Sequence, residues 1–288
     1  MTALLFGANG QDGYYLSQLL LQSAVELVAV SRSAGGVQAD VGDYAAVEQL
    51  VKRHRPDYIF HLAANSTTRH DALFENHATI STGTLNILES VKQHSPASKV
   101  FISGSGLQFK NDNQPIKETD AFEARDAYSV SRIQSVYAAR YYRRLGIQTY
   151  VGYFFNHDSP RRSERHMAKL VSEAARRIAA GSPEKLPIGD LAAVKEWTYA
   201  GDVVKGVWTL VQQNEVAEAN IGSGIGYSIE DWLETCFGLV GKDWKEYVIK
   251  KDNFISEYRQ LVSDSSRMFS LGWKPEVSLA GLAAMMMR

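Results

Sequence analysis

Cysteine is nearly missing from this sequence of 288 residues, which contains only Cys236. No disulfide can therefore form within the chain, and a reducing compartment suits it. An excess of charge of one sign is missing too, because 31 lysines and arginines face 32 aspartates and glutamates, for a formal net charge of -1. This balance argues against a protein that binds nucleic acid through its overall charge.

Hydrophobic runs that could cross a membrane are also missing, since none approaches the ~20 apolar residues that a spanning helix needs. Residues 1–6 carry no basic segment and lead directly into a glycine turn, which favours a buried strand over a signal peptide. The seven histidines include no pair four residues apart and no H-E-x-x-H motif, so nothing indicates a metal site. We therefore expect a cytoplasmic protein that uses no metal, no membrane and no nucleic acid.

Short apolar runs alternate with helical patterns through the first half of the chain. This alternation predicts an α/β protein of the Rossmann type, a doubly wound parallel sheet with right-handed crossovers. The expected strands are 3–6, 27–30, 58–62, 100–103 and 149–154, and the expected helices are 14–23, 44–53, 84–94 and 127–145.

The regular alternation of strand and helix patterns ends after residue 155. We expect a basic amphipathic helix over 161–180, helices over 203–212 and 228–240, and a sixth strand over 219–221. No flexible linker separates the two parts, so the second should be built onto the first. The predicted dinucleotide-binding domain comprises 1–155 plus about 201–222, and the smaller C-terminal substrate-binding lobe comprises 156–200 plus 223–288.

A glycine-rich turn follows the first strand and opens the first helix. Its spacing is G-x-x-G-x-x-G, which lets the backbone approach a pyrophosphate at a helix N-terminus. The alternative is a glycine turn with a purely structural role. The residues predicted to hold a dinucleotide here are Gly7, Asn9, Gly10, Gln11, Asp12 and Gly13.

The end of the second strand bears on the choice between NAD and NADP. NAD-binding proteins usually carry an acid there, but this strand ends Val30-Ser31-Arg32-Ser33. Arg32 can pair with a 2′-phosphate, which predicts NADP(H) as the cofactor. The alternative is that Arg32 is a solvated loop residue.

Two further segments fit a bound dinucleotide. Asp40 and Val41 stand where an aspartate could meet the adenine amino group, and the small residues around Leu62, Ala63 and Ala64 let a cofactor lie close to the backbone. Both segments are equally compatible with ordinary turn chemistry.

Several longer strings extend these motifs almost to the end of the chain. They are the Gln11-Asp12 pair in the glycine turn and the segments 155–162, 189–197, 220–224 and 271–275. With them the sequence resembles the extended short-chain dehydrogenase/reductase family of NAD-dependent epimerases and dehydratases. Within that family it is most similar to the branch of GDP-mannose 4,6-dehydratase and GDP-6-deoxy-4-keto-hexose reductase.

This resemblance implies a substrate, a substrate site and an oligomer. The substrate would be a GDP-sugar, bound by Asn156, with Arg161, Arg162 and Lys195 near the diphosphate or the base. Pairing of the helices over 84–94 and 127–145 would give a homodimer or homotetramer. The alternative for the arginines is one solvated helix face shared with Arg165 and Lys169.

The family pattern Tyr-x-x-x-Lys appears here as Tyr128 followed by Arg132. The resemblance implies that Tyr128 exchanges a proton with a substrate oxygen while hydride moves to or from nicotinamide. Arg132 can still favour the ionised phenol and reach ribose hydroxyls, but it stays protonated and cannot pass a proton on. The alternative for Tyr128 is an aromatic residue on a helix face.

Two other catalytic positions of the family are glycines. Gly104 stands where a Ser or Thr holds the substrate oxygen, and Gly106 stands where dehydratases carry a Glu. Ser103 or Ser105 could replace the first. Other residues that could supply a missing base are Glu123, Asp126 and His157.

These losses affect dehydration more than reduction. We therefore expect NADP-dependent reduction of a 4-keto-6-deoxy GDP-sugar in preference to GDP-mannose 4,6-dehydration. A third possibility is a protein that binds NADP or a nucleotide sugar with weakened catalysis.

Overall fold

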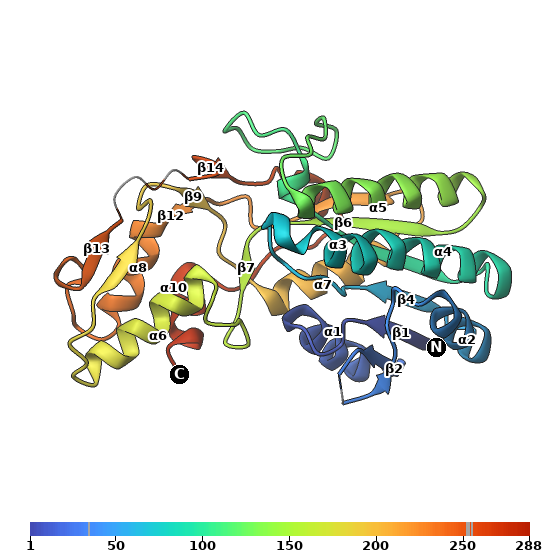
Figure 1. Cartoon of the computed structure of the whole chain (residues 1–288), viewed down its shortest axis with the longest axis horizontal. Coiled ribbons are helices and arrows are strands. Elements are labelled where there is room, and N and C mark those ends of the chain that lie inside the picture. Colours follow the sequence, from blue (N-terminus) through green and yellow to red (C-terminus); the bar gives the residue numbers. More distant parts are fainter. Residues whose placement is uncertain (34, 252–253, 255) are drawn as a thin grey trace.

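A computed structural model describes residues 1–288 apart from 34, 252–253 and 255. Its main sheet has seven strands in the order β11-β6-β5-β4-β1-β2-β3, and every pairing is parallel (Figure 1). The strands are β1 (Thr2–Phe6), β2 (Glu26–Ser31), β3 (Val37–Gln38), β4 (Tyr58–His61), β5 (Lys99–Ser105), β6 (Thr149–Phe154) and β11 (Glu218–Ile221). The predicted Rossmann fold is confirmed, and the strand order reverses between β1 and β4, where such sheets bind ligands.

Helices cover both faces of the sheet, so its central strands are buried on both sides. Along β1, Leu4 and Phe6 pack into one hydrophobic cluster, whereas Ala3 and Leu5 pack into another. The helices on the first face are α2 (Tyr44–His54), α4 (Gly83–His94) and α5 (Ala127–Arg144). Those on the second are α1 (Gln11–Gln22) and α7 (Ala200–Val211).

The predicted strands and helices of the first half are confirmed, with shifts of up to three residues at their ends. The prediction that a helix begins at Arg161 was wrong, because α6 spans Met167–Ala179. The preceding residues form turns instead, in which Arg162 N–H donates to the Ser159 carbonyl and His166 N–H to that of Ser163. The arginines before Met167 therefore share no helix face.

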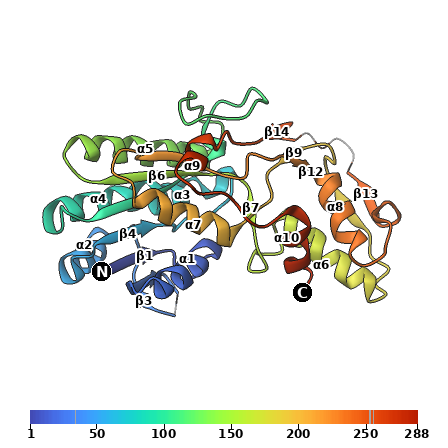
Figure 2. The same ribbon diagram turned by 180° about the vertical axis from the view of Figure 1, so that it is seen from behind.

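A smaller body lies beside the carboxyl ends of the main strands (Figures 1 and 2). Its core surrounds Trp232, whose ring stacks on that of Trp197 at a centroid distance of 4.6 Å. Its helices are α6, α8 (Ile229–Gly238) and α10 (Leu279–Met286). Its short strand pairs are β7 (His157–Asp158) with β10 (Thr198–Tyr199), β8 (Leu186–Ile188) with β13 (Val248–Lys250), and β9 (Val194–Lys195) with β12 (Tyr227–Ser228) and β14 (Gln260–Leu261).

The two remaining α-helices in the described part of the chain are short: α3 (Leu73–Asn76) and α9 (Ser266–Ser270). Among the described helices, none combines the length and apolarity that crossing a membrane requires.

Candidate active site

The glycine turn has the backbone shape that a pyrophosphate site needs. Gly7 has a φ of +90°, and a Cβ there would lie 2.6 Å from the Ala63 nitrogen. A Cβ on Gly13 would lie 2.2 Å from the Gly7 carbonyl oxygen. Gly10 is the N-cap of α1 and supplies no side-chain cap, so the first N–H groups of the helix face the turn. A phosphate group fits this arrangement.

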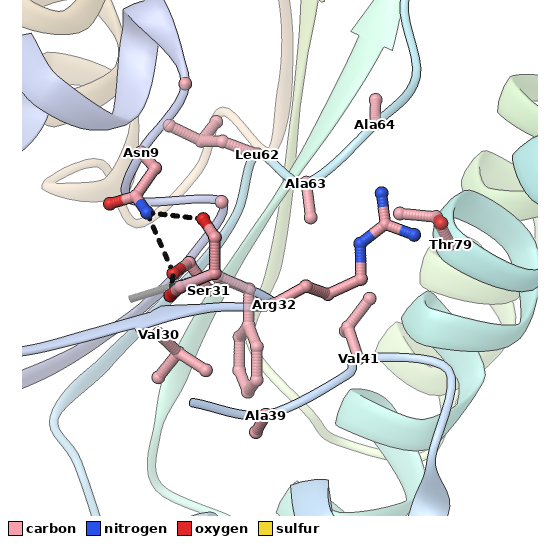
Figure 3. Close-up of a pocket in the computed structure, with 14 residues that line it drawn as sticks. Asn9, Val30, Ser31, Arg32, Ala39, Val41, Leu62, Ala63, Ala64 and Thr79 are labelled. Atoms are coloured by element: carbon pink, nitrogen blue, oxygen red, sulfur yellow. Dashed lines mark hydrogen bonds between the residues drawn. The ribbon is translucent and has the colours of Figure 1, made fainter. Parts of the chain in front are cut away.

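A pocket of about 190 Å³ extends from the turn along the end of β2 (Figure 3). The predicted cofactor residues that line it are Gly7, Asn9, Gly10, Arg32, Val41, Leu62, Ala63 and Ala64. The Asn9 amide donates to the hydroxyls of Ser31 at 3.0 Å and Ser33 at 2.9 Å. Asp40 lies outside this lining, and its carboxylate accepts from the Gly42 N–H at 2.9 Å. Its neighbours Ala39 and Val41 line the pocket, and the contact of Asp40 with adenine stays a prediction.

A larger cleft of about 620 Å³ continues from the same turn to the smaller body. It brings together most of the other predicted site residues: Gln11, Asp12, Gly13, Ser103, Ser105, Tyr128, Arg132, Asn156 and Arg162. No catalytic or binding role was predicted for the other polar residues that line it: Ser66, Thr67, Thr68, Arg69, Arg165, His166, Glu257 and Tyr258.

Tyr128 and Arg132 stand one turn apart at the start of α5. The carboxylate of Asp126 caps this helix by accepting from the N–H groups of Tyr128 and Ser129. The Arg132 guanidinium lies 4.9 Å from the centre of the Tyr128 ring, and only 4% of the arginine is exposed. Among the described residues no carboxylate pairs with Arg132, and its Nη1 donates to the carbonyl and the hydroxyl of Ser103.

Two serines on β5 face the cleft, and their hydrogen bonds differ. The Ser103 hydroxyl donates to the His61 carbonyl at 3.0 Å and accepts from Arg132 Nη1 at 2.7 Å. The Ser105 hydroxyl accepts from the Leu107 N–H at 3.2 Å, and its hydrogen has no protein acceptor in the described chain. Ser105 can therefore donate to a substrate oxygen, whereas the proton of Ser103 is already used.

The comparisons with known proteins agree with this geometry. The model of the family described as GDP-mannose 4,6 dehydratase matches residues 4–286. The chain belongs to this family. It is a nucleotide-sugar enzyme of the short-chain dehydrogenase/reductase type, and because GDP-mannose dehydratases use NADP(H), the predicted cofactor is confirmed.

Alignments with individual relatives cover most of this chain. GDP-mannose 4,6 dehydratase 2 of Arabidopsis thaliana is 29% identical over 317 residues, covering 99% of this chain and 85% of the relative. The human GDP-mannose 4,6 dehydratase is 26% identical over 269 residues, covering 83% of this chain and 72% of the relative.

Solved structures share the fold at lower identity. RMD from Pseudomonas aeruginosa, complexed with NADPH, has a TM-score of 0.87 at 20% identity and covers 100% of this chain and 98% of its own. The dTDP-glucose 4,6-dehydratase of Bacillus anthracis, complexed with NAD, has a TM-score of 0.86 at 19% identity, with coverage of 99% and 95%.

The two glycines that depart from the family pattern are explained by packing. A Cβ on Gly106 would lie 2.8 Å from the ring of Phe155, which itself lines the cleft. A Cβ on Gly104 would lie 2.6 Å from the Tyr153 ring. Phe155 thus occupies the space next to position 106, and a glutamate there would require the ring to move.

None of the three residues suggested as a replacement base is free for that role. Asp126 is engaged as the helix cap, and Glu123 pairs with Arg125. His157 lines the cleft, but its Nδ1 contacts the Phe155 carbonyl at 2.7 Å and its Nε2 contacts Asp12 at 2.9 Å. With an acceptor at each nitrogen, the geometry favours the doubly protonated imidazole.

The pair of Asp12 and His157 joins the start of α1, next to the glycine turn, to β7. Burial alone would lower the pKa of His157, but the charge and hydrogen bond of Asp12 outweigh it and raise that pKa. Burial conversely opposes ionisation of Asp12, yet His157 holds the pKa of this carboxyl below its ordinary value. Beside the pair, the Ser159 hydroxyl donates to Gln11 Oε1 at 2.8 Å. The side chains of Gln11 and Asp12 therefore bind β7 and the residue that follows it.

The predicted substrate cations separate into two groups. Arg162 lines the cleft and pairs with buried Asp158 at 3.3 Å. Arg161 and Lys195 lie outside the cleft lining. Arg161 stacks over Tyr14 at 3.9 Å, and the Lys195 ammonium lies 4.4 Å from the centre of the Trp197 ring, where burial lowers its pKa.

The cleft residues that the sequence did not indicate have two origins. Thr67, Thr68 and Arg69 lie in the loop that follows β4, so their place after a strand of the parallel sheet was a usable signal. Glu257 and Tyr258 come from a segment before β14 that carries no motif, and only the tertiary fold brings them to the cleft.

Proposed function

We propose that this enzyme uses NADPH to reduce the ketone of a 4-keto-6-deoxy GDP-sugar. The supporting observation is that the cleft offers groups for a ketone oxygen but has no room beside Gly106 for the glutamate of a dehydratase. Tyr128 and Ser105 remain available for a carbonyl oxygen, whereas the Phe155 ring fills the space beside Gly106, where a dehydratase carries its glutamate.

The residues around the two pockets fit the cofactor, and each group of them would have its own role. The turn at Gly7, Gly10 and Gly13 would hold the pyrophosphate, and Arg32 the 2′-phosphate. When bound, NADPH supplies the hydride. Ser105 would donate a hydrogen bond to the ketone oxygen, and Tyr128 would give that oxygen its proton.

Arg132 would support this proton transfer by its charge. Its guanidinium lies under the Tyr128 ring and stabilises the phenolate that remains after the proton has left. On the substrate side, Asn156, Arg162 and Arg165 face the cleft and would hold the sugar and its diphosphate.

GDP-mannose 4,6-dehydration is the second candidate, and the family match favours it. Elimination of water needs a base in the cleft. Apart from Asp12, which His157 engages, Glu257 is the one carboxylate among the described residues that line it. A binding protein without turnover is the third candidate.

Product analysis separates the three. The protein is incubated with GDP-mannose and NADP⁺, and in a second reaction with GDP-4-keto-6-deoxymannose and NADPH, and the nucleotide sugars are analysed by mass spectrometry. Reduction adds one hydride and one proton to the keto sugar, dehydration removes one water from GDP-mannose, and a binding protein changes neither. Loss of water from GDP-mannose would replace the reductase assignment.

We also propose a homodimer formed through α4 and α5. Leu85 on α4 and Tyr137 and Tyr141 on α5 are apolar or aromatic side chains exposed by 48%, 59% and 58%. Light scattering coupled to gel filtration measures this, and a monomer would contradict it. The cytoplasmic location and the boundaries of the substrate-binding lobe stay predictions.

A further inference from the structure

We infer that Glu75 sets how strongly this enzyme prefers NADPH over NADH, because it competes with the 2′-phosphate for Arg32. The inference rests on the proposed role of Arg32 in the cofactor pocket. It adds a residue that is outside the pocket lining and comes from a different element.

The geometry brings three elements to one carboxylate. Arg32, just after β2, extends across the pocket toward Thr79 and Ala64 (Figure 3). Its Nη2 lies 3.2 Å from Oε1 of Glu75 on α3. The other oxygen, Oε2, accepts from the Asn65 amide at 2.9 Å, in the loop after β4. Two partners therefore hold the carboxylate beside the guanidinium.

A cofactor that carries a 2′-phosphate would add a second anion to this guanidinium. A phosphate monoester carries about −1.5 to −2 charges at neutral pH, so Glu75 would repel it and share its cation. NADH has a hydroxyl at the same place, which a carboxylate tolerates and can bind. The Glu75 charge therefore opposes NADPH and leaves NADH unaffected or favoured.

Exposure determines the size of the effect. The side chains of Arg32 and Glu75 are 57% and 46% exposed, so water and salt weaken both the pair and the repulsion. We expect removal of the charge to tighten NADPH binding by about three- to tenfold at low salt, and by less at high salt.

Glu75→Gln tests the inference because glutamine keeps the size and the acceptor for Asn65. The dissociation constants of NADPH and NADH are measured by nucleotide fluorescence for the parent protein, E75Q, R32A and the double variant. Asp71→Asn is the matched control, since Asp71 is a nearby exposed acid paired with Arg69 and not with Arg32. Circular dichroism confirms that each variant is folded.

The inference predicts a larger NADPH preference in E75Q, a smaller gain from E75Q when Arg32 is already alanine, because only the direct repulsion is then relieved, and no change in D71N. An unchanged or smaller preference in E75Q would overturn it, and so would an equal gain in D71N. If the parent protein binds NADPH but E75Q leaves the preference unchanged, the cofactor assignment stands and this inference alone falls. If the parent protein binds neither nucleotide, the proposed function falls and this inference with it.

Discussion

Asp12 in the first turn of α1 and His157 on β7 meet at 2.9 Å between Oδ1 and Nε2. They are 145 residues apart in the sequence, and the histidine side chain is only 9% exposed. The turn that approaches the cofactor is thereby fixed to the loop that carries Asn156 and Arg162 into the cleft. The ion pair therefore joins two segments that line the same cleft.

Asp12→Asn should destabilise the protein in a way that depends on pH. The pKa of His157 is raised above its ordinary 6.5 and that of Asp12 is lowered below its ordinary 3.8. The pair therefore stabilises fully between these two ordinary values, and the contribution fades as pH rises through the folded-state pKa of His157. We expect a loss of about 1–3 kcal/mol in the free energy of unfolding near pH 5.5, and a smaller loss at alkaline pH.

Urea denaturation at several pH values measures this difference. Asp112→Asn is the control, because Asp112 pairs with Lys110 with both side chains more than half exposed and should change stability by less than about 0.5 kcal/mol. A deficit of D12N that grows with alkaline pH would contradict the ion pair.

The two serines of β5 should differ when each is replaced by alanine. Ser105→Ala removes the hydroxyl that is proposed to bind the ketone oxygen and should lower kcat by about 10- to 100-fold, with the melting temperature little changed. Ser103→Ala removes the hydroxyl that links Arg132 to the His61 carbonyl and should cost about 1–2 kcal/mol of stability. Steady-state kinetics and thermal denaturation of both variants measure these losses. A larger kcat loss in S103A than in S105A would assign the contact with the ketone oxygen to Ser103 instead.

Gly106→Glu should destabilise through Phe155. The new side chain would start 2.8 Å from the phenyl ring, and overpacking of this kind costs about 1–3 kcal/mol. In the background of Phe155→Ala the same substitution should cost less, because the ring is gone. A double-mutant cycle in urea measures the coupling, and strictly additive losses would show that Phe155 does not limit position 106.

The fold was predictable because its signals are local. Short apolar runs located β1, β2, β4, β5 and β6, but not the two-residue strand β3. The glycine turn after β1 could be recognised from its spacing, to which Gly7 adds a positive φ in the structure. The start of α6 was not predictable in the same way. The stretch from Arg161 to His166 has helical composition, but the Asp158–Arg162 pair and the turn at Ser159 hold it in another shape.

The candidate site was predictable only where a motif marks it. Tyr128 and Arg132 were found by their spacing, but the sequence could not choose between Ser103 and Ser105, because that choice depends on which hydroxyl proton is already used. Glu75 carried no signal either, since its relation to Arg32 exists only once α3 lies beside the end of β2.

The most direct test of the central claim is NADPH oxidation with GDP-4-keto-6-deoxymannose, followed at the absorbance of the reduced nicotinamide, for the parent protein and Tyr128→Phe. GDP-mannose with NADPH is the control substrate. We predict NADPH consumption that requires the keto sugar and falls by about 10²- to 10⁴-fold in Y128F, with the dissociation constant of NADPH unchanged. NADPH that binds but is not consumed with the keto sugar, or consumption that survives in Y128F, would contradict the reductase account.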